Sequence, residues 1–278
     1  MITRKTFTRS LISAFALSAM SIAPNGLASA AEQSAAVTSG ITNFRLDYTG
    51  SLFIFPMGTL TLAGQKNSYG YSMRADMDTA GIAKMTKSGG LWSTSVGYYD
   101  KADIRPTQHV IQKLNKKGRR VEINYDAEGA PTSTIAPRFG SMGQPAASDA
   151  ERAEAVDALS GIMQLMMTGH TYSDAPCSGS VPIFDGKQRY DLRLEKAGNN
   201  YIRQSSYKGE TVRCHVYMET VSGYDTEDLL TAEEAATPIV IYLAEFKEAG
   251  LWVPVRFDYR VSGIKVNIKA TNIDISNG

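Results

Sequence analysis

Apolar and polar residues alternate one by one in several short stretches of this chain, and the alternation restricts those stretches to β-structure. Four stretches show it most clearly: residues 120–125, 189–194, 252–261 and 264–268. Successive side chains of a strand point to opposite faces, so a period of two is typical of an antiparallel sheet with one buried and one solvated face.

Less regular strands extend the pattern over most of the chain. We expect them at residues 43–48, 52–55, 59–63, 69–77, 91–98, 200–207 and 211–219, and a doubly buried strand at 238–246. Pairs such as Lys117-Gly118 and Asp185-Gly186 separate the strands as tight turns. We therefore predict a mostly β fold, in which a single large antiparallel meander forms a curved sheet or an open or half-closed barrel.

One amphipathic helix is predicted at about residues 148–168. Ser148 and Glu151 have the spacing of a capping box, and Gly169 follows as a stop signal. Between them apolar residues recur at helical spacing: Val156, Leu159, Met163 and Met166. We interpret this stripe as core packing against the sheet, with an adaptable methionine-rich binding surface as the alternative.

Residues 127–147 interrupt the alternation before that helix. They contain Pro131, Pro137 and Pro145 together with three glycines, and they show no hydrophobic period. We predict a long irregular loop, either a flexible crossover or a lid over a cavity.

The first thirty residues have the three parts of a secretory signal. Arg4, Lys5 and Arg9 precede an apolar stretch at 11–23, and small residues then end at Ala30. We expect cleavage between Ala30 and Ala31, which leaves residues 31–278 as a single β-rich periplasmic domain. The alternative is an amphipathic helix of a cytoplasmic protein.

Charge argues against nucleic acid as a partner. The whole chain has 29 Lys+Arg and 28 Asp+Glu, and residues 1–30 hold three basic and no acidic residues, so 26 Lys+Arg face 28 Asp+Glu after cleavage. A nucleic-acid binder would show a strong basic excess. No later apolar stretch is long enough to span a membrane, so we expect no membrane-spanning helix.

Cys177 and Cys214 are the only cysteines. In an oxidising compartment an even pair indicates a disulfide bond. A reactive thiol or a metal ligand is the alternative, although zinc would need four ligands and only His170 and His215 lie nearby in sequence.

Motifs for common catalytic chemistry are absent from the sequence. It contains no Gly-x-Ser-x-Gly elbow, phosphate-binding loop, dinucleotide fingerprint or His-Glu-x-x-His pair. His109, His170 and His215 lie far apart, although a Ser/His/Asp set can assemble in space from distant residues. We therefore predict no enzyme, catalytic residue, cofactor or metal.

A basic cluster surrounds the predicted turn at Gly118. It consists of Lys113, Lys116, Lys117, Arg119 and Arg120. Several positive charges at one hairpin tip would attract an anionic lipid surface. The alternative is an ordinary solvated turn.

Residues 177–194 carry a pattern that resembles the central signature of a known family. A cysteine is followed by a glycine two residues later and then by six residues: Phe184, Asp185, Gly186, Arg189, Tyr190 and Asp191. Residues 119–129, 213–217 with 222–224, and 253–256 are similar to other parts of the same family. Over about residues 43–273 the chain thus resembles the exported proteobacterial family catalogued as domain of unknown function 3108. The resemblance implies a periplasmic β protein with a disulfide, and it supplies no catalytic residues.

Two functional hypotheses follow. The first is a non-enzymatic envelope protein that binds a lipid or lipoprotein, or acts as a scaffold for envelope integrity, and it predicts an apolar cavity that side chains do not fill. The second is a periplasmic hydrolase, and it predicts one of the three histidines beside an acid and a nucleophile in a cleft. A purely structural interaction protein would have neither feature.

Overall fold

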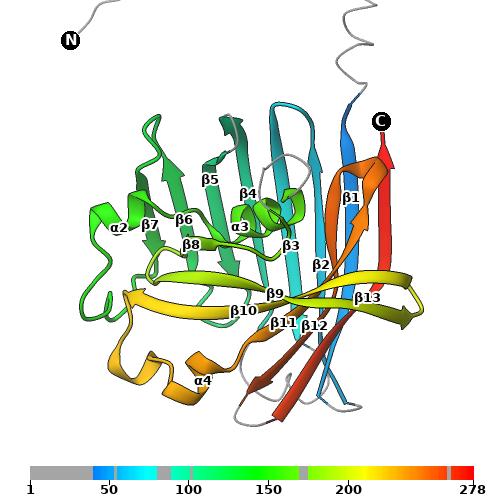
Figure 1. The fold of residues 1–278 in the computed structure, drawn as a ribbon. Helices are drawn as coiled ribbons and strands as arrows, with labels where there is room; N and C mark the ends of the chain where they lie inside the picture. Colours follow the sequence, from blue (N-terminus) through cyan, green and yellow to red (C-terminus); the bar gives the residue numbers. More distant parts are fainter. Residues whose placement is uncertain (1–39, 53–54, 80–88, 101–102, 169–174, 262–263) are drawn as a thin grey trace, which may run out of the picture. The chain divides into compact units, whose positions relative to one another are not determined.

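The computed structural model describes residues 40–52, 55–79, 89–100, 103–168, 175–261 and 264–278. Thirteen strands in these residues form one sheet (Figure 1). The strands are β1 (Thr42–Leu52), β2 (Phe55–Lys66), β3 (Gly70–Thr79), β4 (Leu91–Asp100), β5 (Asp103–Lys113), β6 (Arg120–Tyr125), β7 (Pro131–Ala136), β8 (Ser180–Phe184), β9 (Arg189–Gln204), β10 (Tyr207–Ser222), β11 (Ile239–Phe246), β12 (Leu251–Val261) and β13 (Ile264–Asn277). The helices are α2 (Asp149–Ala153), α3 (Ala158–Met167), α4 (Ala232–Ala236) and the 3-10 turns η2 (Thr226–Asp228) and η3 (Lys247–Ala249).

The sheet is an antiparallel meander whose first and last strands meet in its middle. Its order is β7-β6-β5-β4-β3-β2-β1-β13-β12-β11-β10-β9-β8, and β1 pairs with β13 from Thr42↔Asn277 to Leu52↔Val266. The two edge strands, β7 and β8, are not paired with each other in the described structure, so the sheet stays open. The predicted mostly β fold with one antiparallel meander is confirmed.

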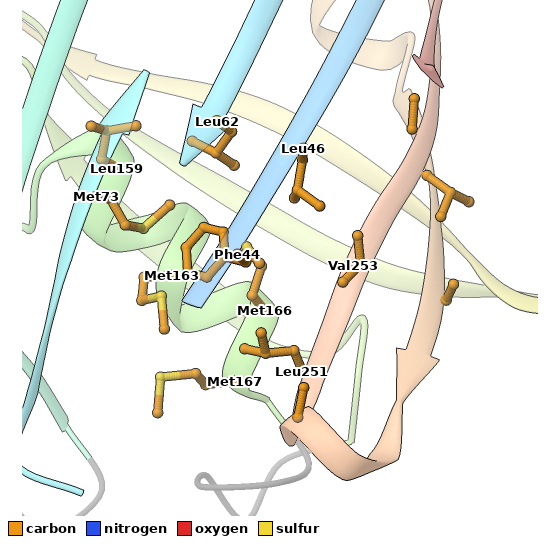
Figure 2. Close-up of a cluster of buried hydrophobic side chains, with 14 of the residues drawn as sticks. Phe44, Leu46, Leu62, Met73, Leu159, Met163, Met166, Met167, Leu251 and Val253 are labelled. Carbon is orange, nitrogen blue, oxygen red and sulfur yellow. The ribbon is translucent and has the colours of Figure 1, made fainter. Parts of the chain in front are cut away.

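Both halves of the sheet pack against α3. The helix contacts β3, β4 and β5 on one side of the strand order and β8 and β12 on the other. A sheet whose distant strands contact one helix must curve around it, which confirms the predicted curvature. Figure 2 shows the resulting core, where Met163, Met166 and Met167 of α3 lie beside Phe44 and Leu251.

The methionine stripe is therefore core, as interpreted from the sequence. Met163 and Met166 are 0% exposed and Met167 is 2% exposed. Burying one such side chain stabilises a fold by about 1.5–3 kcal/mol relative to leaving it in water. Gly161 lets α3 approach β8 closely, because a Cβ there would lie 2.7 Å from Cδ1 of Ile183.

The single helix expected at about 148–168 is wrong in one respect, because the structure has two helices there. The capping box of Ser148 and Glu151 is present, but it begins only the short α2. Residue Val156 then leaves the helix and bonds to the edge of β8: its N–H donates to Pro182 at 3.0 Å, and Phe184 donates to its carbonyl at 2.9 Å. Covering an exposed edge strand in this way blocks pairing with other chains.

The Cys177–Cys214 disulfide is present, with 5.3 Å between the two Cα atoms. It joins the segment before β8 to β10, and both sulfur-bearing side chains are buried in one apolar cluster. Closing a loop between residues 37 apart stabilises the fold by about 4 kcal/mol in the chain-entropy model. The predicted cleavage site at Ala30 and Ala31 lies outside the described residues. In the described residues, no helix has the length and apolar character needed to cross a membrane.

Candidate functional site

A cavity of about 330 Å³ lies between α3 and the curved sheet. Its walls come from both halves of the sheet and from the helix. The lining residues are Tyr48, Leu60, Leu62, Ala75, Met77, Leu91, Ser93, His109, Ile111, Ala158, Leu159, Gly161, Ile162, Leu165, Val181, Leu192, Leu194, Val216, Ile241, Pro254 and Phe257. Nearly all of this lining is apolar, which is the composition of sites for apolar small molecules.

The cavity reaches the surface beside Met77. This residue lines the cavity and is nevertheless 43% exposed. It pairs with Leu91 of β4, which also lines the cavity and in turn pairs with Lys113 at the end of β5. We infer that the mouth of the cavity is this exposed part of the lining, at Met77 and Leu91 beside the turn from β5 to β6.

Polar groups are confined to a few of the lining residues. Tyr48 donates its hydroxyl hydrogen to the carbonyl of Pro254 at 2.8 Å, so its polar end is already bonded. The others are Ser93 of β4 and His109 of β5, which are 6% and 1% exposed. They come from neighbouring strands and form one polar end in an otherwise apolar space.

Asp157 stands behind His109 and begins α3. Its Oδ1 accepts from the N–H groups of Leu159 and Ser160, both at 3.0 Å, as an N-cap does. The same Oδ1 lies 2.9 Å from Nδ1 of His109, in poor alignment for a linear hydrogen bond. One carboxylate thus starts the helix and holds one side of the imidazole ring.

Hydroxyl groups complete the environment of Asp157. Its Oδ2 accepts from Ser95 at 3.0 Å and from the hydroxyl of Ser160. Tyr71 lies 2.6 Å from the Ser160 oxygen and supplies the next bond outward. Complete satisfaction of this kind is what allows a buried charged group to persist.

Burial raises the pKa of the Asp157 carboxyl, but the interaction with neighbouring His109 and the hydrogen bonds from Ser160 outweigh burial. The pKa therefore lies below its ordinary value of 3.8. Asp157 is consequently an ionised group at neutral pH, although it is 0% exposed. An ionised carboxylate at Nδ1 keeps a proton on that nitrogen of His109.

Ser93 lies on the other side of the ring. Its oxygen is 3.5 Å from Nε2 of His109, at the outer limit of a hydrogen bond, and it donates to the carbonyl of Val110 at 2.8 Å. The order Ser93, His109, Asp157 is that of a nucleophile, a base and an orienting acid. His109 is thus the described histidine that lies close to both a serine and a carboxylate.

Sequence reasoning named His109 as a candidate but missed Ser93 and Asp157. A signal for Asp157 was present, because an aspartate directly before the apolar helical residues Ala158 and Leu159 is a typical N-cap. His170 lies outside the described residues. His215 lies on β10 with its ring centroid 6.4 Å from that of Tyr217, and it is not among the cavity-lining residues.

The family-signature residues build the β8–β9 hairpin. Phe184 is buried, and the Asp185 carboxylate accepts from the N–H groups of Lys187 and Gln188 at 2.9 and 2.7 Å, which fixes the turn. Gly186 has φ +98°, and a Cβ at this position would clash with the side chain of Val121 on β6, so only glycine fits.

The strand that follows is anchored to α2. Arg189 donates to the carbonyl of Glu151 at 3.0 Å and pairs with Asp191 at 2.6 Å. Burial raises the pKa of the Tyr190 hydroxyl. These contacts join the β8 edge to the opposite half of the sheet, so the signature residues have structural roles.

The basic cluster divides into two groups. Arg119 donates to the carbonyls of Pro137 and Arg138 and stacks over Phe139 at 4.1 Å, and Arg120 pairs with Glu122 at 3.1 Å. The three lysines, Lys113, Lys116 and Lys117, are exposed around Leu114, which is 56% exposed. Of these five basic residues, only the three lysines are exposed, so they are the ones able to contact another charged surface.

A metal centre is not built from the described side chains, since they contain no group of three or more His, Cys, Asp or Glu residues able to hold an ion. The polar chemistry of the cavity consequently rests on Ser93, His109 and Asp157.

Comparison with known proteins gives a family and a distant structure. No curated protein matches the chain. A crystal structure of a DUF1329 family protein from Desulfovibrio piger matches with 12% identity and a TM-score of 0.28, over 88% of this chain and 89% of that one. The family model described as protein of unknown function (DUF3108) matches residues 43–269. This chain belongs to the DUF3108 family.

Proposed function

We propose that this protein is exported to the periplasm and binds one acyl chain of a lipid or lipoprotein in the cavity between α3 and the sheet. The observation that carries the proposal is the cavity itself, about 330 Å³ of space with an almost wholly apolar lining. A disulfide is compatible with export, because such bonds persist in oxidising compartments. The scaffold hypothesis does not require this space.

The size of the cavity favours a single chain. An apolar engineered cavity of about 150 Å³ stays dry and takes one benzene ring. The cavity here is about twice that volume, and its two long walls are α3 and the facing strands. Burial of ten methylene groups contributes about 8 kcal/mol before the costs of association are subtracted. Burial of the chain is therefore the main favourable contribution expected for binding in this cavity.

The exposed lysines support a docking role for the mouth. Lys113 pairs with the cavity-lining Leu91, and Leu114 donates to the carbonyl of Gly90 at 2.8 Å. Positive charges around an exposed leucine match an anionic lipid surface, with the leucine in the acyl region and the lysines at the headgroups. We propose that the turn between β5 and β6, with its three lysines and Leu114 (the lysine-rich tip), brings the mouth to such a surface.

Displacement of a fluorescent apolar dye by dodecanoic acid tests the binding proposal. Ala75 lines the cavity and is buried, so Ala75→Phe should fill the space and weaken dodecanoic acid binding at least tenfold. Val96→Phe introduces the same ring at a position that is 47% exposed, and it should leave binding unchanged. Equal binding by both variants would contradict the proposed site, and thermal unfolding checks that both fold.

A second candidate function is hydrolysis of an acyl ester, favoured by the order Ser93, His109, Asp157. The Ser93 oxygen would attack the ester carbonyl, and its proton would pass to Nε2 of His109 and then to the leaving alkoxide. Water would next release the acid from the acyl-serine. This requires Ser93 to leave its 2.8 Å bond to Val110.

Release of p-nitrophenol from p-nitrophenyl dodecanoate tests this second candidate. Hydrolysis that Ser93→Ala abolishes would favour an enzyme. Ser178→Ala is the matched control, because Ser178 is exposed and also donates to a backbone carbonyl, that of Ala175. Equal rates for wild type and Ser93→Ala would exclude Ser93 as the nucleophile.

A further inference from the structure

We propose that the polar end of the cavity recognises an O–H group at the end of the bound chain, through Nε2 of His109 and the oxygen of Ser93. The inference rests on the proposed acyl-chain binding and adds the chemical class of the ligand. Among the single-chain ligands of the proposed function, it selects a free long-chain alcohol or an un-ionised free acid over a chain that is esterified in a lipid or lipoprotein, because the ester has no O–H donor.

Asp157 fixes which tautomer a neutral His109 adopts. Asp157 is fully buried and accepts four hydrogen bonds, two at Oδ1 and two at Oδ2. It is therefore ionised, and it lies 2.9 Å from Nδ1 of His109. In the neutral imidazole the proton is then on Nδ1, and Nε2 carries a lone pair.

Within the described structure, Nε2 of His109 receives no strong hydrogen bond. The hydroxyl hydrogen of Ser93 is directed to the carbonyl of Val110 at 2.8 Å, so it cannot also donate to Nε2 at 3.5 Å. Because His109 is 1% exposed, water does not freely replace the missing donor. A buried acceptor without a donor is unfavourable, and a ligand that supplies one gains affinity.

The Ser93 oxygen is likewise an acceptor that faces the cavity. With its hydrogen used by Val110, the Ser93 oxygen also presents lone pairs. Both groups line the cavity and lie 3.5 Å apart, so one O–H group can approach both and donate its single hydrogen to either of them. The end of the cavity is thus built from acceptors, and its complement is a donor.

Apolar residues fix the direction of the ligand. Ser93 and His109 share the cavity with Leu62, Ile162 and Phe257, so a chain with one polar end can satisfy both regions at once. A second polar group along the chain would have to be buried against apolar side chains without a partner. The ligand class is therefore a chain with a single terminal O–H.

Binding of three probes to the whole protein tests the inference: 1-dodecanol, dodecanoic acid and methyl dodecanoate. The alcohol should bind about tenfold more tightly than the methyl ester, which has no donor hydrogen. Dodecanoic acid in its un-ionised form should share the advantage. Equal affinity for the alcohol and the ester would overturn the inference, and preference for the acid alone would replace it with recognition of a carboxylate.

His109→Phe is the matched variant, because it keeps a ring in the lining and removes both nitrogens. It should lose the preference for the alcohol, so that the ratio of alcohol affinity to ester affinity falls to about one. Persistence of the preference in a folded variant would also overturn the inference. If none of the three probes binds wild type, the acyl-chain proposal itself fails, and that result differs from binding without preference. The ranking of probes on wild type needs no variant, so misfolding of His109→Phe leaves the test intact.

Discussion

Asp157 connects helix initiation to the chemistry of the cavity at the scale of single residues. Its carboxylate caps α3 through Leu159 and Ser160 and holds His109 from behind. Any change in its charge should therefore affect both the stability of the fold and the position of the imidazole ring. The same atoms would serve an ester hydrolase or a binding site, and the ester assay with Ser93→Ala distinguishes the two.

Asp157→Asn should reduce stability and flatten its dependence on acid pH. The folded-state pKa of Asp157 lies below its ordinary value of 3.8, so its ionisation stabilises the fold above that value, and this stability is lost as pH falls toward the folded-state pKa. The wild-type free energy of unfolding should decline more steeply than that of the variant below about pH 4. Urea unfolding at a series of pH values measures both.

Asp149→Asn is the control for this prediction. Asp149 lies in the first turn of α2 with its side chain 94% exposed, so its substitution should change unfolding by no more than a few tenths of a kcal/mol. Parallel pH profiles for wild type and Asp157→Asn would contradict the assignment of Asp157 as a buried carboxylate.

The residue-scale site was only partly predictable from sequence. His109 could be named because histidines are rare in this chain, but its partners could not. Ser93 lies 16 positions from it on the neighbouring strand, and Asp157 lies 62 positions after Ser95. Those distances close only when β4 and β5 pair and α3 docks on them, and no local pattern encodes that docking.

The stretch that carries α2 and α3 shows why helical spacing can mislead at the scale of elements. Val156 fits the apolar period of a helix, yet it bonds to β8 as an edge partner. A second N-cap at Asp157 then starts α3. The sequence signal for that second start was weaker than the capping box at Ser148, so the break was missed.

Residues 127–147 show the opposite error. Their prolines and glycines predicted an irregular loop, but β7 occupies Pro131–Ala136 at the edge of the sheet. Its first residue is a proline, which a sheet tolerates at the start of an edge strand. The clear period-two strands, such as those at 120–125 and 252–261, were predicted well because burial of one face dictates their pattern.

Gly161→Ala should destabilise the packing of α3 on β8, even though alanine favours helices. The new Cβ would lie 2.7 Å from Cδ1 of Ile183, and overpacking of this kind costs about 1–3 kcal/mol. Ile183→Val removes that methyl group and should restore part of the loss in the double variant. Urea unfolding of the single and double variants measures the coupling.

Gly140→Ala provides the control for glycine replacement. Nothing lies within 4 Å of a Cβ at Gly140, so unfolding should change little. A Gly161→Ala protein as stable as Gly140→Ala would show that the helix does not pack as closely as described.

The whole molecule is an open antiparallel sheet wrapped around one helix, with its cavity mouth beside a lysine-rich tip. Under the proposed function, that arrangement would separate two tasks, namely holding a chain inside and meeting a surface outside. Val156 covers the edge of β8, and Phe184 of the β8–β9 hairpin packs against Val121 and Ile123 of β6. These contacts hold the two ends of the sheet together without a closed barrel.

Removing the tip charges should weaken association with anionic vesicles without changing ligand binding. Lys113, Lys116 and Lys117 replaced by Gln should lower partitioning onto phosphatidylserine vesicles by about 100-fold, at about 1 kcal/mol for each lysine. Three exposed lysines elsewhere, Lys196, Lys208 and Lys247, replaced by Gln serve as the control. Equal loss in both triple variants would indicate net charge alone as the cause.

Native mass spectrometry tests the central claim most directly, with protein purified without denaturant from the cells that make it. The same sample after extraction with organic solvent is the reference. We predict an additional mass, equal to one single-chain lipid, that disappears on extraction and is absent from Ala75→Phe. A bare protein mass before extraction, together with no binding of added dodecanoic acid, would contradict the claim that this cavity holds an acyl chain.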